Sequence, residues 1–165
     1  MVRWLLVCLA AATLAFAAAA EELINRFDVG LEVEADGDLI VTETITVTAE
    51  GNQIRRGIFR DMPRYFLMDG DRMRYGYKVL SLKRNGEREP YETSTVNNAW
   101  RIRIGDEDRF LSPGEHVYEI RYRVKNQVRY FEEFDEIYWN VTGNYWSFPI
   151  LEASARITLP EGAQM

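Results

Sequence analysis

The sequence is poor in the residues that most often carry chemistry, with one cysteine and one histidine in 165 residues. Cys8 lies inside an apolar run at the N-terminus, so the rest of the chain has no thiol for a disulfide or a zinc site. His116, beside the turn at residues 114–115, is expected to be an exposed residue at the start of a strand. Because a Ser–His or Cys–His pair has so little support, we predict no catalytic residue, no cofactor and no metal site.

Basic residues are also in the minority, with 20 lysines and arginines against 26 acidic residues. The first twenty residues hold one basic residue, Arg3, and no acidic residue. The remainder therefore has 19 basic and 26 acidic residues and a net charge of −7. A domain of that charge is a poor binder of nucleic acid, so we predict no nucleic-acid partner.

Residues 1–20 have the pattern of a secretory signal peptide. Arg3 precedes an apolar run that ends in four alanines, and two glutamates follow directly. This order predicts a helical leader that is cleaved after Ala20. The alternative is an uncleaved membrane anchor, because about 17 apolar residues is the lower limit for a spanning helix. Residues 21–165 have the length of one domain.

After the leader, apolar residues recur at every second position, which is the period of a half-buried strand. No segment there has a convincing helical period. Asn85 and Gly86 are the pair favoured in a type I′ hairpin turn. Roughly nine short strands separated by turns predict an all-β fold, specifically an antiparallel β-sandwich of immunoglobulin-like size. The predicted strands are residues 23–33, 39–48, 75–82, 88–94, 100–104, 118–124, 128–134, 136–142 and 153–159.

Several local features qualify this pattern. Asn25 is an exception on the apolar face of the first strand. Residues 68–74 are expected to form a polar loop. Pro90 limits its strand to a sheet edge, because proline has no N–H to donate. The two strands before and after residues 134–135 are expected to pair with one another.

Residues 135–150 contain the densest aromatic and apolar run outside the leader. Ile137, Trp139 and Val141 alternate with polar residues, which predicts a strand with one buried face. Large aromatic side chains bury about 150–250 Å² each, so this stretch is expected to anchor the core. The predicted core aromatics are Trp139, Trp146, Tyr118 and Tyr122.

Glu43 falls on an apolar strand face, between Val41 and Ile45. A carboxylate that points into a core needs a partner or a shifted pKa. The nearest arginines in the sequence belong to the segment after Gly51. We predict that Glu43 and Arg60 form a structural ion pair that fixes this segment against the sheet.

The same segment interleaves arginines with apolar residues. Arg55, Arg56, Arg60 and Arg64 form a candidate ligand patch for phosphate or acidic glycans. The alternative is that these arginines pair with carboxylates of the domain itself, Glu43 among them.

Carbohydrate binding or glycan processing is the alternative function. Trp100, Trp139 and Trp146, together with nine tyrosines, are candidate stacking platforms. A binding module requires exposed and coplanar aromatics, and a hydrolase requires two carboxylates roughly 5–10 Å apart in one cleft. The candidate carboxylates are Glu132, Glu133, Asp135 and Glu136.

Five short blocks occur in order along nearly the whole of residues 21–165. They are DGDLIVTE at 36–43, GIFRDMP at 57–63, YEIRY at 118–122, EIYWNVTG at 136–143 with Trp146, and ITLP at 157–160. Taken together, they resemble the bacterial predicted membrane proteins grouped as domain of unknown function 2207. The ordered set is more specific than any single block.

The resemblance implies a signal, an extracytoplasmic β domain, transmembrane helices and often a low-complexity cytoplasmic tail. It implies no activity, because the family has none assigned. The sequence stops directly after a predicted strand, so we expect the front of a longer protein whose domain lacks its final strands. We predict a non-enzymatic extracytoplasmic interaction domain, anchored in the membrane of the cell envelope by helices beyond residue 165. Its expected partner is an envelope protein or a second copy.

Overall fold

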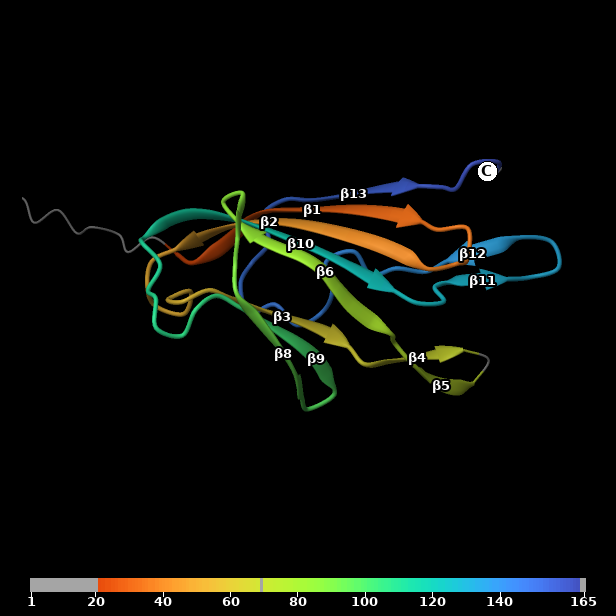
Figure 1. Cartoon of the computed structure of the whole chain (residues 1–165), viewed down its shortest axis with the longest axis horizontal. Helices are drawn as coiled ribbons and strands as arrows, with labels where there is room; N and C mark the ends of the chain where they lie inside the picture. Colours follow the sequence, from red (N-terminus) through yellow and green to blue (C-terminus); the bar gives the residue numbers. More distant parts are fainter. Residues whose placement is uncertain (1–20, 69, 164–165) are drawn as a thin grey trace, which may run out of the picture.

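The structure is a computed structural model that describes residues 21–68 and 70–163. These ranges contain thirteen strands and no helix, which confirms the predicted all-β class (Figure 1). The predicted signal peptide, residues 1–20, lies outside the described residues. Its helical form and its cleavage therefore stay predictions.

Six strands form the larger sheet, in the order β13-β1-β2-β10-β6-β7. Neighbouring strands are antiparallel except β1 and β13, which run parallel. The expectation of a wholly antiparallel fold is therefore wrong at this edge, where the first and last strands lie side by side. The strands are β1 (Leu23–Val33), β2 (Leu39–Ala49), β6 (Tyr77–Arg84), β7 (Glu87–Arg88), β10 (Gly114–Val124) and β13 (Ala153–Thr158).

Three strands form a second sheet, in the order β3-β9-β8, and two hairpins stand apart from both sheets. The second sheet consists of β3 (Ile58–Pro63), β8 (Tyr91–Val96) and β9 (Ala99–Ile104). One hairpin pairs β4 (Tyr65–Met68) with β5 (Asp71–Arg74), and the other pairs β11 (Val128–Tyr130) with β12 (Asp135–Ile137).

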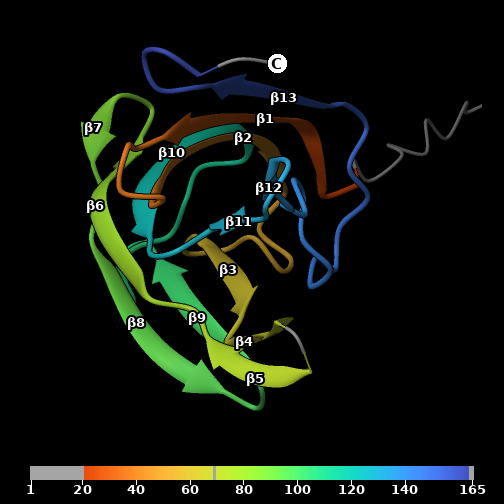
Figure 2. The same ribbon diagram turned by 90° about the vertical axis from the view of Figure 1, so that its right-hand side faces the viewer.

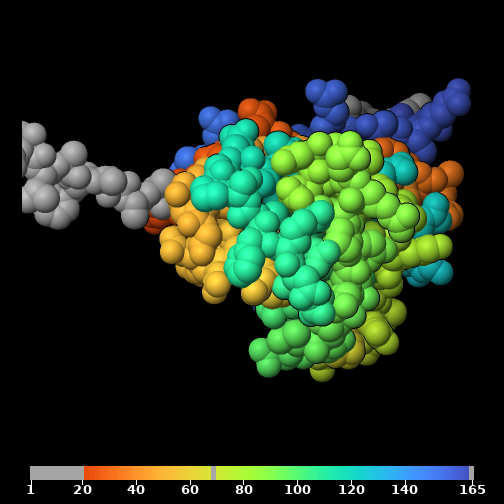
Figure 3. Space-filling model, turned by 60° about the vertical axis from the view of Figure 1, so that its left-hand side comes forward, coloured from red at the N-terminus to blue at the C-terminus, as the bar shows by residue number. Residues whose placement is uncertain are grey.

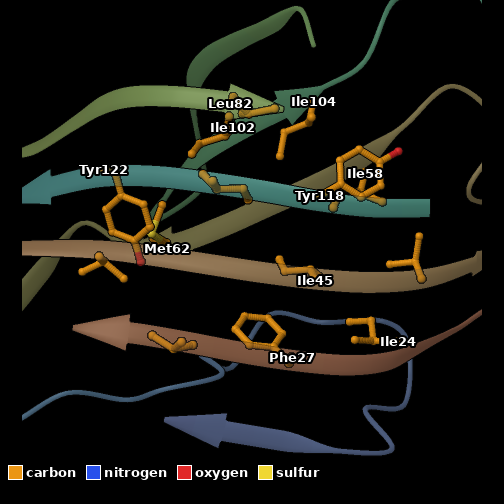
Figure 4. Close-up of a cluster of buried hydrophobic side chains, with 14 of the residues drawn as sticks. Ile24, Phe27, Ile45, Ile58, Met62, Leu82, Ile102, Ile104, Tyr118 and Tyr122 are labelled. Carbon is orange, nitrogen blue, oxygen red and sulfur yellow. The ribbon is translucent and has the colours of Figure 1, made fainter. Parts of the chain in front are cut away.

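The two sheets share one hydrophobic core. Phe27, Ile45 and Tyr118 point into it from the larger sheet, and Ile58 and Ile102 point into it from the second sheet (Figure 4). Figure 2 shows the second sheet on one side of the larger one. Each large apolar side chain that leaves water in this way contributes about 1.5–3 kcal/mol. The alternating apolar positions of both sheets thus converge on one interior.

The start of β1 departs from strict alternation. Its register with β2 shifts between Ile24 and Arg26, so Ile24 is fully buried and Leu23, expected inside, is half-buried. Asn25 is also half-buried, and its side-chain amide donates to Thr48 Oγ1 at 2.9 Å. Such a bulge adds one residue to one strand. It explains why Asn25 interrupts the apolar face in the sequence.

Two segments differ from their predicted structure: the loop expected over residues 68–74 and the strand expected over residues 88–94. Residues 68–74 are not a polar loop, because residues 71–74 are β5 and pair with β4 in a largely exposed hairpin. The sequences of β4 (YFLM) and β5 (DRMR) lack the alternation of apolar and polar residues that marks a half-buried strand. The strand expected over residues 88–94 is split at Pro90, which cannot continue the ladder with β6, and β8 then joins the other sheet.

The hairpin at Asn85 and Gly86 forms as predicted, with positive φ values of 52° and 84°. The strand expected over residues 136–142 ends at Ile137, and its turn lies at residues 131–134 and not at 134–135. Residues 138–150 are mostly irregular and fold against the core. The alternation of apolar residues in this stretch therefore indicates packing and not a strand.

Candidate functional site

Glu43 lies near the centre of the larger sheet and pairs with an arginine of the second sheet. Its neighbours across the strands are Val29 of β1 and Ile120 of β10, and its side chain is fully buried. Arg60 points inward from β3 and is 3% exposed. Its Nε donates to Glu43 Oε2 at 2.8 Å, and its Nη2 donates to Glu43 Oε1 at 2.7 Å. These two bonds join the sheets across the core.

Two more hydrogen bonds complete the polar network. The hydroxyl of Tyr122 donates to Glu43 Oε1 at 2.7 Å, and Arg60 Nη1 donates to the carbonyl oxygen of Asp61 at 3.2 Å. Bidentate and charge-assisted bonds of this kind are the strong ones in proteins. Glu43 Oε1 therefore accepts from one donor of each sheet, and Glu43 Oε2 accepts from Arg60.

The guanidinium of Arg60 is covered by aromatic rings and by a glycine. Its central carbon lies 5.6 Å from the ring centroid of Phe27 and 5.3 Å from that of Trp146, within range of cation–π attraction. Gly143 has a φ of 76°, and a Cβ at this residue would lie 2.7 Å from Arg60 Nη1. The backbone angle favours glycine here, and any Cβ would force the guanidinium of Arg60 to shift.

The surroundings fix the charge state of the network. Burial alone would lower the pKa of Arg60, but the charge of Glu43 and the hydrogen bonds to it raise this pKa above its ordinary value. Burial, with the charge of Glu43, raises the pKa of Tyr122 well above its usual value. The arginine stays cationic and the tyrosine stays a neutral donor. The arrangement is suited to holding two sheets together and not to moving protons.

The predicted core aromatics differ in depth. Tyr118 and Tyr122 are fully buried on β10. Trp139 and Trp146 are partly buried and pack against the core from residues 138–150. Trp146 meets Phe27 edge to face, and its Nε1 donates to the carbonyl oxygen of Thr142 at 2.9 Å. Neither tryptophan presents the exposed, coplanar platform that a glycan module requires.

The four arginines of the candidate ligand patch do not form one site. Arg60 is buried and cannot meet a ligand from solvent. Arg55 and Arg56 are exposed before β3, and their guanidinium carbons lie 5.4 and 4.1 Å from the ring centroid of Phe110. Arg64 follows the other end of β3, which is about 20 Å long at the usual rise of a strand. The prediction of a single patch is wrong because a strand intervenes.

His116 is buried, contrary to the expectation of an exposed residue. Its Nε2 lies 2.9 Å from the carbonyl oxygen of Ser112, and its Nδ1 lies 3.3 Å from the side-chain nitrogen of Asn85. A ring protonated at Nε2 satisfies both contacts. The residue is buried because β10 begins at Gly114, four residues before the predicted strand.

The candidate carboxylates of a hydrolase lie on the β11–β12 hairpin and not in a cleft. Glu132, Glu133 and Asp135 are exposed, and Glu136 forms an ion pair with Arg129 at 3.4 Å. Across residues 21–68 and 70–163, no group of three or more histidine, cysteine or acidic side chains is arranged to hold a metal ion.

Glu22 is another buried carboxylate, which the sequence analysis missed. Burial favours a raised pKa, but four hydrogen bonds from backbone N–H groups outweigh it, so the pKa of Glu22 is lowered. No periodicity reveals such a residue, because its partners are backbone groups of a loop. The donors are the N–H groups of Glu50, Asn52, Gln53 and Ile54, at 3.0, 3.0, 2.6 and 3.1 Å.

An open groove of about 340 Å³, here called the arginine groove, was also missed. It is lined by Arg64, Arg74, Tyr75, Tyr77 and Trp100. The ring of Tyr77 stacks between those of Tyr75 and Trp100, with centroids 5.2 and 4.9 Å away. Neither Arg64 nor Arg74 has an ion pair within the described ranges. The residues that line the groove come from separate segments of the chain, so no local sequence motif predicts the groove.

A third feature missed by the sequence analysis is a set of exposed apolar side chains on and beside the two hairpins, here called the hairpin surface. Its side chains are between 40% and 71% exposed. Figure 1 shows both hairpins at the same end of the molecule, and Arg129 Nη2 donates to the carbonyl oxygen of Leu67 at 3.4 Å between them. The hairpin surface consists of Leu67, Met73, Tyr130, Phe131, Phe134 and Tyr138.

These features define an all-β domain with a sealed polar centre and an open apolar end. The sequence pattern of the predicted membrane protein (DUF2207) N-terminal domain matches residues 23–165. The chain therefore belongs to this family, which confirms the predicted resemblance.

The uncharacterized protein YciQ of Escherichia coli (strain K12) is 38% identical to the chain over 131 residues. The match covers 79% of this chain and 21% of YciQ, so the chain spans about a fifth of the length of this relative.

Among solved structures, an M1 zinc metallopeptidase from Deinococcus radiodurans is similar over 62% of this chain and 20% of the peptidase, with 22% identity and a TM-score of 0.41. Native yeast LTA4 hydrolase is similar over 62% of this chain and 14% of the hydrolase, with 10% identity and a TM-score of 0.46. Similarities this low support no inference about activity. In the part of the chain that the structure describes, no helix is long and apolar enough to cross a membrane.

Proposed function

We propose that this chain is the extracytoplasmic interaction domain of a membrane-anchored envelope protein, and that it acts by binding and not by catalysis. The hairpin surface is the observation that carries the proposal. Membership of a family of predicted membrane proteins and the leader pattern of residues 1–20 support the location. We further propose that the two sheets are a β-sandwich of immunoglobulin-like size, an architecture that presents its loops at the two ends.

Exposed apolar side chains are ordinary when they are scattered and informative when they gather. Here six of them lie on and beside two adjacent hairpins. Phe131 and Phe134 contact each other, with ring centroids 4.9 Å apart, and Tyr138 shares a hollow of about 170 Å³ with Leu67 of the other hairpin. Aromatic residues and methionine are enriched in protein interfaces. The clustering therefore favours a binding role for this end.

Charges of both signs surround the hairpin surface. Arg72 and Arg129 lie on the hairpins, and Glu132 and Glu133 stand between the two phenylalanines of the tip. Carboxylates at an apolar tip oppose insertion into a bilayer, since removing their charge from water is costly. An apolar patch rimmed by mixed charges matches a protein surface instead. The proposed partner is an envelope protein or a second copy of this chain.

Photo-crosslinking in living cells tests this proposal. A photoreactive amino acid replaces Phe131 or Tyr138, one at a time, in the full-length protein. We expect both positions to give the same defined adduct, and the Phe134→Ser change to abolish the adduct from position 138. Tyr91 on the distant strand β8 is an exposed control that gives no such adduct. Equal products at all three positions would rule out a specific hairpin surface.

The proposed location has its own test. Residues 21–165 contain no cysteine, so Ser94→Cys on exposed β8 introduces a single thiol into this part of the protein. We expect a membrane-impermeant maleimide to label this variant in cells whose cytoplasmic membrane is intact. Labelling that requires lysis would place the domain in the cytoplasm and overturn the proposed location.

The arginine groove favours a second candidate function, the binding of an acidic glycan. Arg64 and Arg74 supply positive charge, and a three-ring stack supplies an aromatic wall. Soluble polygalacturonate is a suitable probe in a calorimetric titration of the purified protein. We expect Arg64→Gln to abolish any binding and Arg88→Gln, an exposed arginine on β7, to leave it unchanged. Equal binding by the two variants would dismiss the groove as a glycan site.

A further inference from the structure

β13 is exposed along its whole length, although one of its faces continues the core layer of the larger sheet. Its register with β1 places Ala153 beside Phe27 and Ile157 beside Leu31, and both of these β1 residues are buried. Side chains of paired residues point to the same face of a sheet. The inner face of β13 is thus apolar like that of β1, yet Ile157 is 55% exposed.

The outer edge of β13 is also open. The strand pairs with β1 on one side, and no described residue pairs with it on the other. Figure 3 shows the corresponding blue residues along the upper margin of the molecule. Natural edge strands are usually protected by an inward charge, a bulge or a covering segment. β13 has no register shift, and its charged residue, Arg156, lies on the outer face. Neither a bulge nor an inward charge therefore protects this edge.

The chain reverses its direction immediately after β13. The N–H of Ala163 donates to the carbonyl oxygen of Pro160 at 3.2 Å, and Gly162 between them has a φ of 86°. A positive φ at the third residue of a four-residue turn is the geometry of a type II turn. Figure 2 shows the chain after β13 turning back on the side away from β1, which is the side of the free edge.

We propose that the polypeptide that follows residue 165 in the full-length protein adds an antiparallel strand to the free edge of β13. Its inward side chains cover Ile157 and Leu159, and its backbone pairs with the open N–H and C=O groups. A relative of which this chain spans 21% has ample length to supply such a strand. The proposal goes beyond the proposed function and does not depend on it.

A second copy of the chain is the competing occupant of this edge. Edge-to-edge pairing of two β13 strands requires the edge to be clear of other chain segments. The turn at residues 160–163 brings the protein's own chain to that edge at very high effective concentration. The geometry therefore favours the covalently attached strand over a second copy.

Thiol labelling of the purified full-length protein tests the proposal. Ile157→Cys places a thiol on the inner face of β13, and the matched variant Arg156→Cys places one on the outer face. With the added strand in place, we expect the inner thiol to react with maleimide at least about 10-fold more slowly than the outer thiol, because reaction requires local opening. Ending the chain after residue 165 should bring the two rates together.

Other outcomes overturn the proposal. Equal rates for the two thiols in the full-length protein would show that no strand covers the inner face. Protection that disappears on dilution, together with a dimer in size-exclusion chromatography, would assign the edge to a second copy. Circular dichroism of both variants, Ile157→Cys and Arg156→Cys, identifies a misfolded protein before labelling. None of these measurements requires the partner of the hairpin surface.

Discussion

Arg60 and Arg64 are four residues apart in one segment and both lie near aromatic rings, yet they differ in burial and in charge pairing. Arg60 is enclosed by Glu43, two aromatic rings and a glycine, and it joins two sheets. Arg64 lies at an open groove and has no ion pair within the described ranges, with the ring centroid of Tyr65 5.2 Å away. The difference shows that a charged side chain that points into the core from a strand is used in an ion pair that stabilises the fold. A charge beyond the strand end stays available to solvent and to ligands.

The largest effect should come from breaking the enclosed pair. Removing one partner strands the other charge, so Glu43→Gln and Arg60→Met should each lower the free energy of unfolding by about 3–5 kcal/mol. The double variant should lose much less than the sum of the two single losses. Urea denaturation of all four proteins measures this coupling. Additive losses would mean that the pair contributes no mutual stabilisation.

The second effect concerns the enclosed carboxylate of Glu22. Charged hydrogen bonds are worth about 1.5–3 kcal/mol, so Glu22→Gln should lower the free energy of unfolding at neutral pH by an amount in this range. Since the pKa of Glu22 is lowered by folding, its contribution is complete above the ordinary pKa of 4.5 and is lost as the pH falls through the folded-state pKa below that value.

Denaturation of the two proteins at several pH values checks this sign. The stability difference between wild type and Glu22→Gln should shrink as the solution is acidified below the ordinary pKa. Glu21→Gln, a change at the exposed neighbouring residue, is the matched control and should show little difference at any pH. A difference that grows on acidification would contradict the assigned hydrogen bonds.

The third effect concerns Gly143, which packs over Arg60. It distinguishes the steric cost of a Cβ from the cost of a positive φ. Gly143→Ala introduces a Cβ that meets Arg60 Nη1, whereas Gly51→Ala has nearly the same φ, 75°, and meets nothing within 4 Å. Both changes carry a backbone cost of about 1–2 kcal/mol for a left-handed residue. Only Gly143→Ala should cost more than that in thermal or urea unfolding. Equal losses would show that the cover adapts freely.

The smallest effect should come from the open arginine. Arg64→Met should change the free energy of unfolding by less than about 0.5 kcal/mol, because Arg64 is only half-buried and the substitution strands no charged partner among the described residues. The same substitution at Arg60 is the matched comparison. A large loss at Arg64 would mean that this residue, too, is committed to the fold.

The sequence contains enough information to predict the long strands and the buried pair. Glu43 interrupts the apolar face of β2, and an inward carboxylate needs a cation. The ion pair between Glu43 and Arg60 can therefore be predicted from the local sequence pattern. The class of fold follows in the same way from the period of β1, β2 and β10. These are consequences of burial on one face of a strand.

Other features depend on contacts between distant segments and leave no local pattern. Pro90 indicates a break but not the transfer of β8 to another sheet. Ile137, Trp139 and Val141 recur at every second position because they pack on the core, although the backbone at Trp139 is not a strand. Glu22 bonds to backbone groups about thirty residues away, and the arginine groove combines residues from several elements. Tertiary packing decides each of these.

The parallel pairing of β1 with β13 also governs the time order of folding. Asp28 and Ser154, which touch across this pair, are 126 residues apart in the chain. During synthesis, which starts at the N-terminus, one edge of β1 stays unpaired until the residues between β1 and β13 have been made. Contacts at such separation form slowly, so the edge of β1 stays unpaired in the meantime. Until β13 is made, the unpaired edge of β1 can pair with other chains, so a chaperone that shields β1 would raise the yield of folded protein.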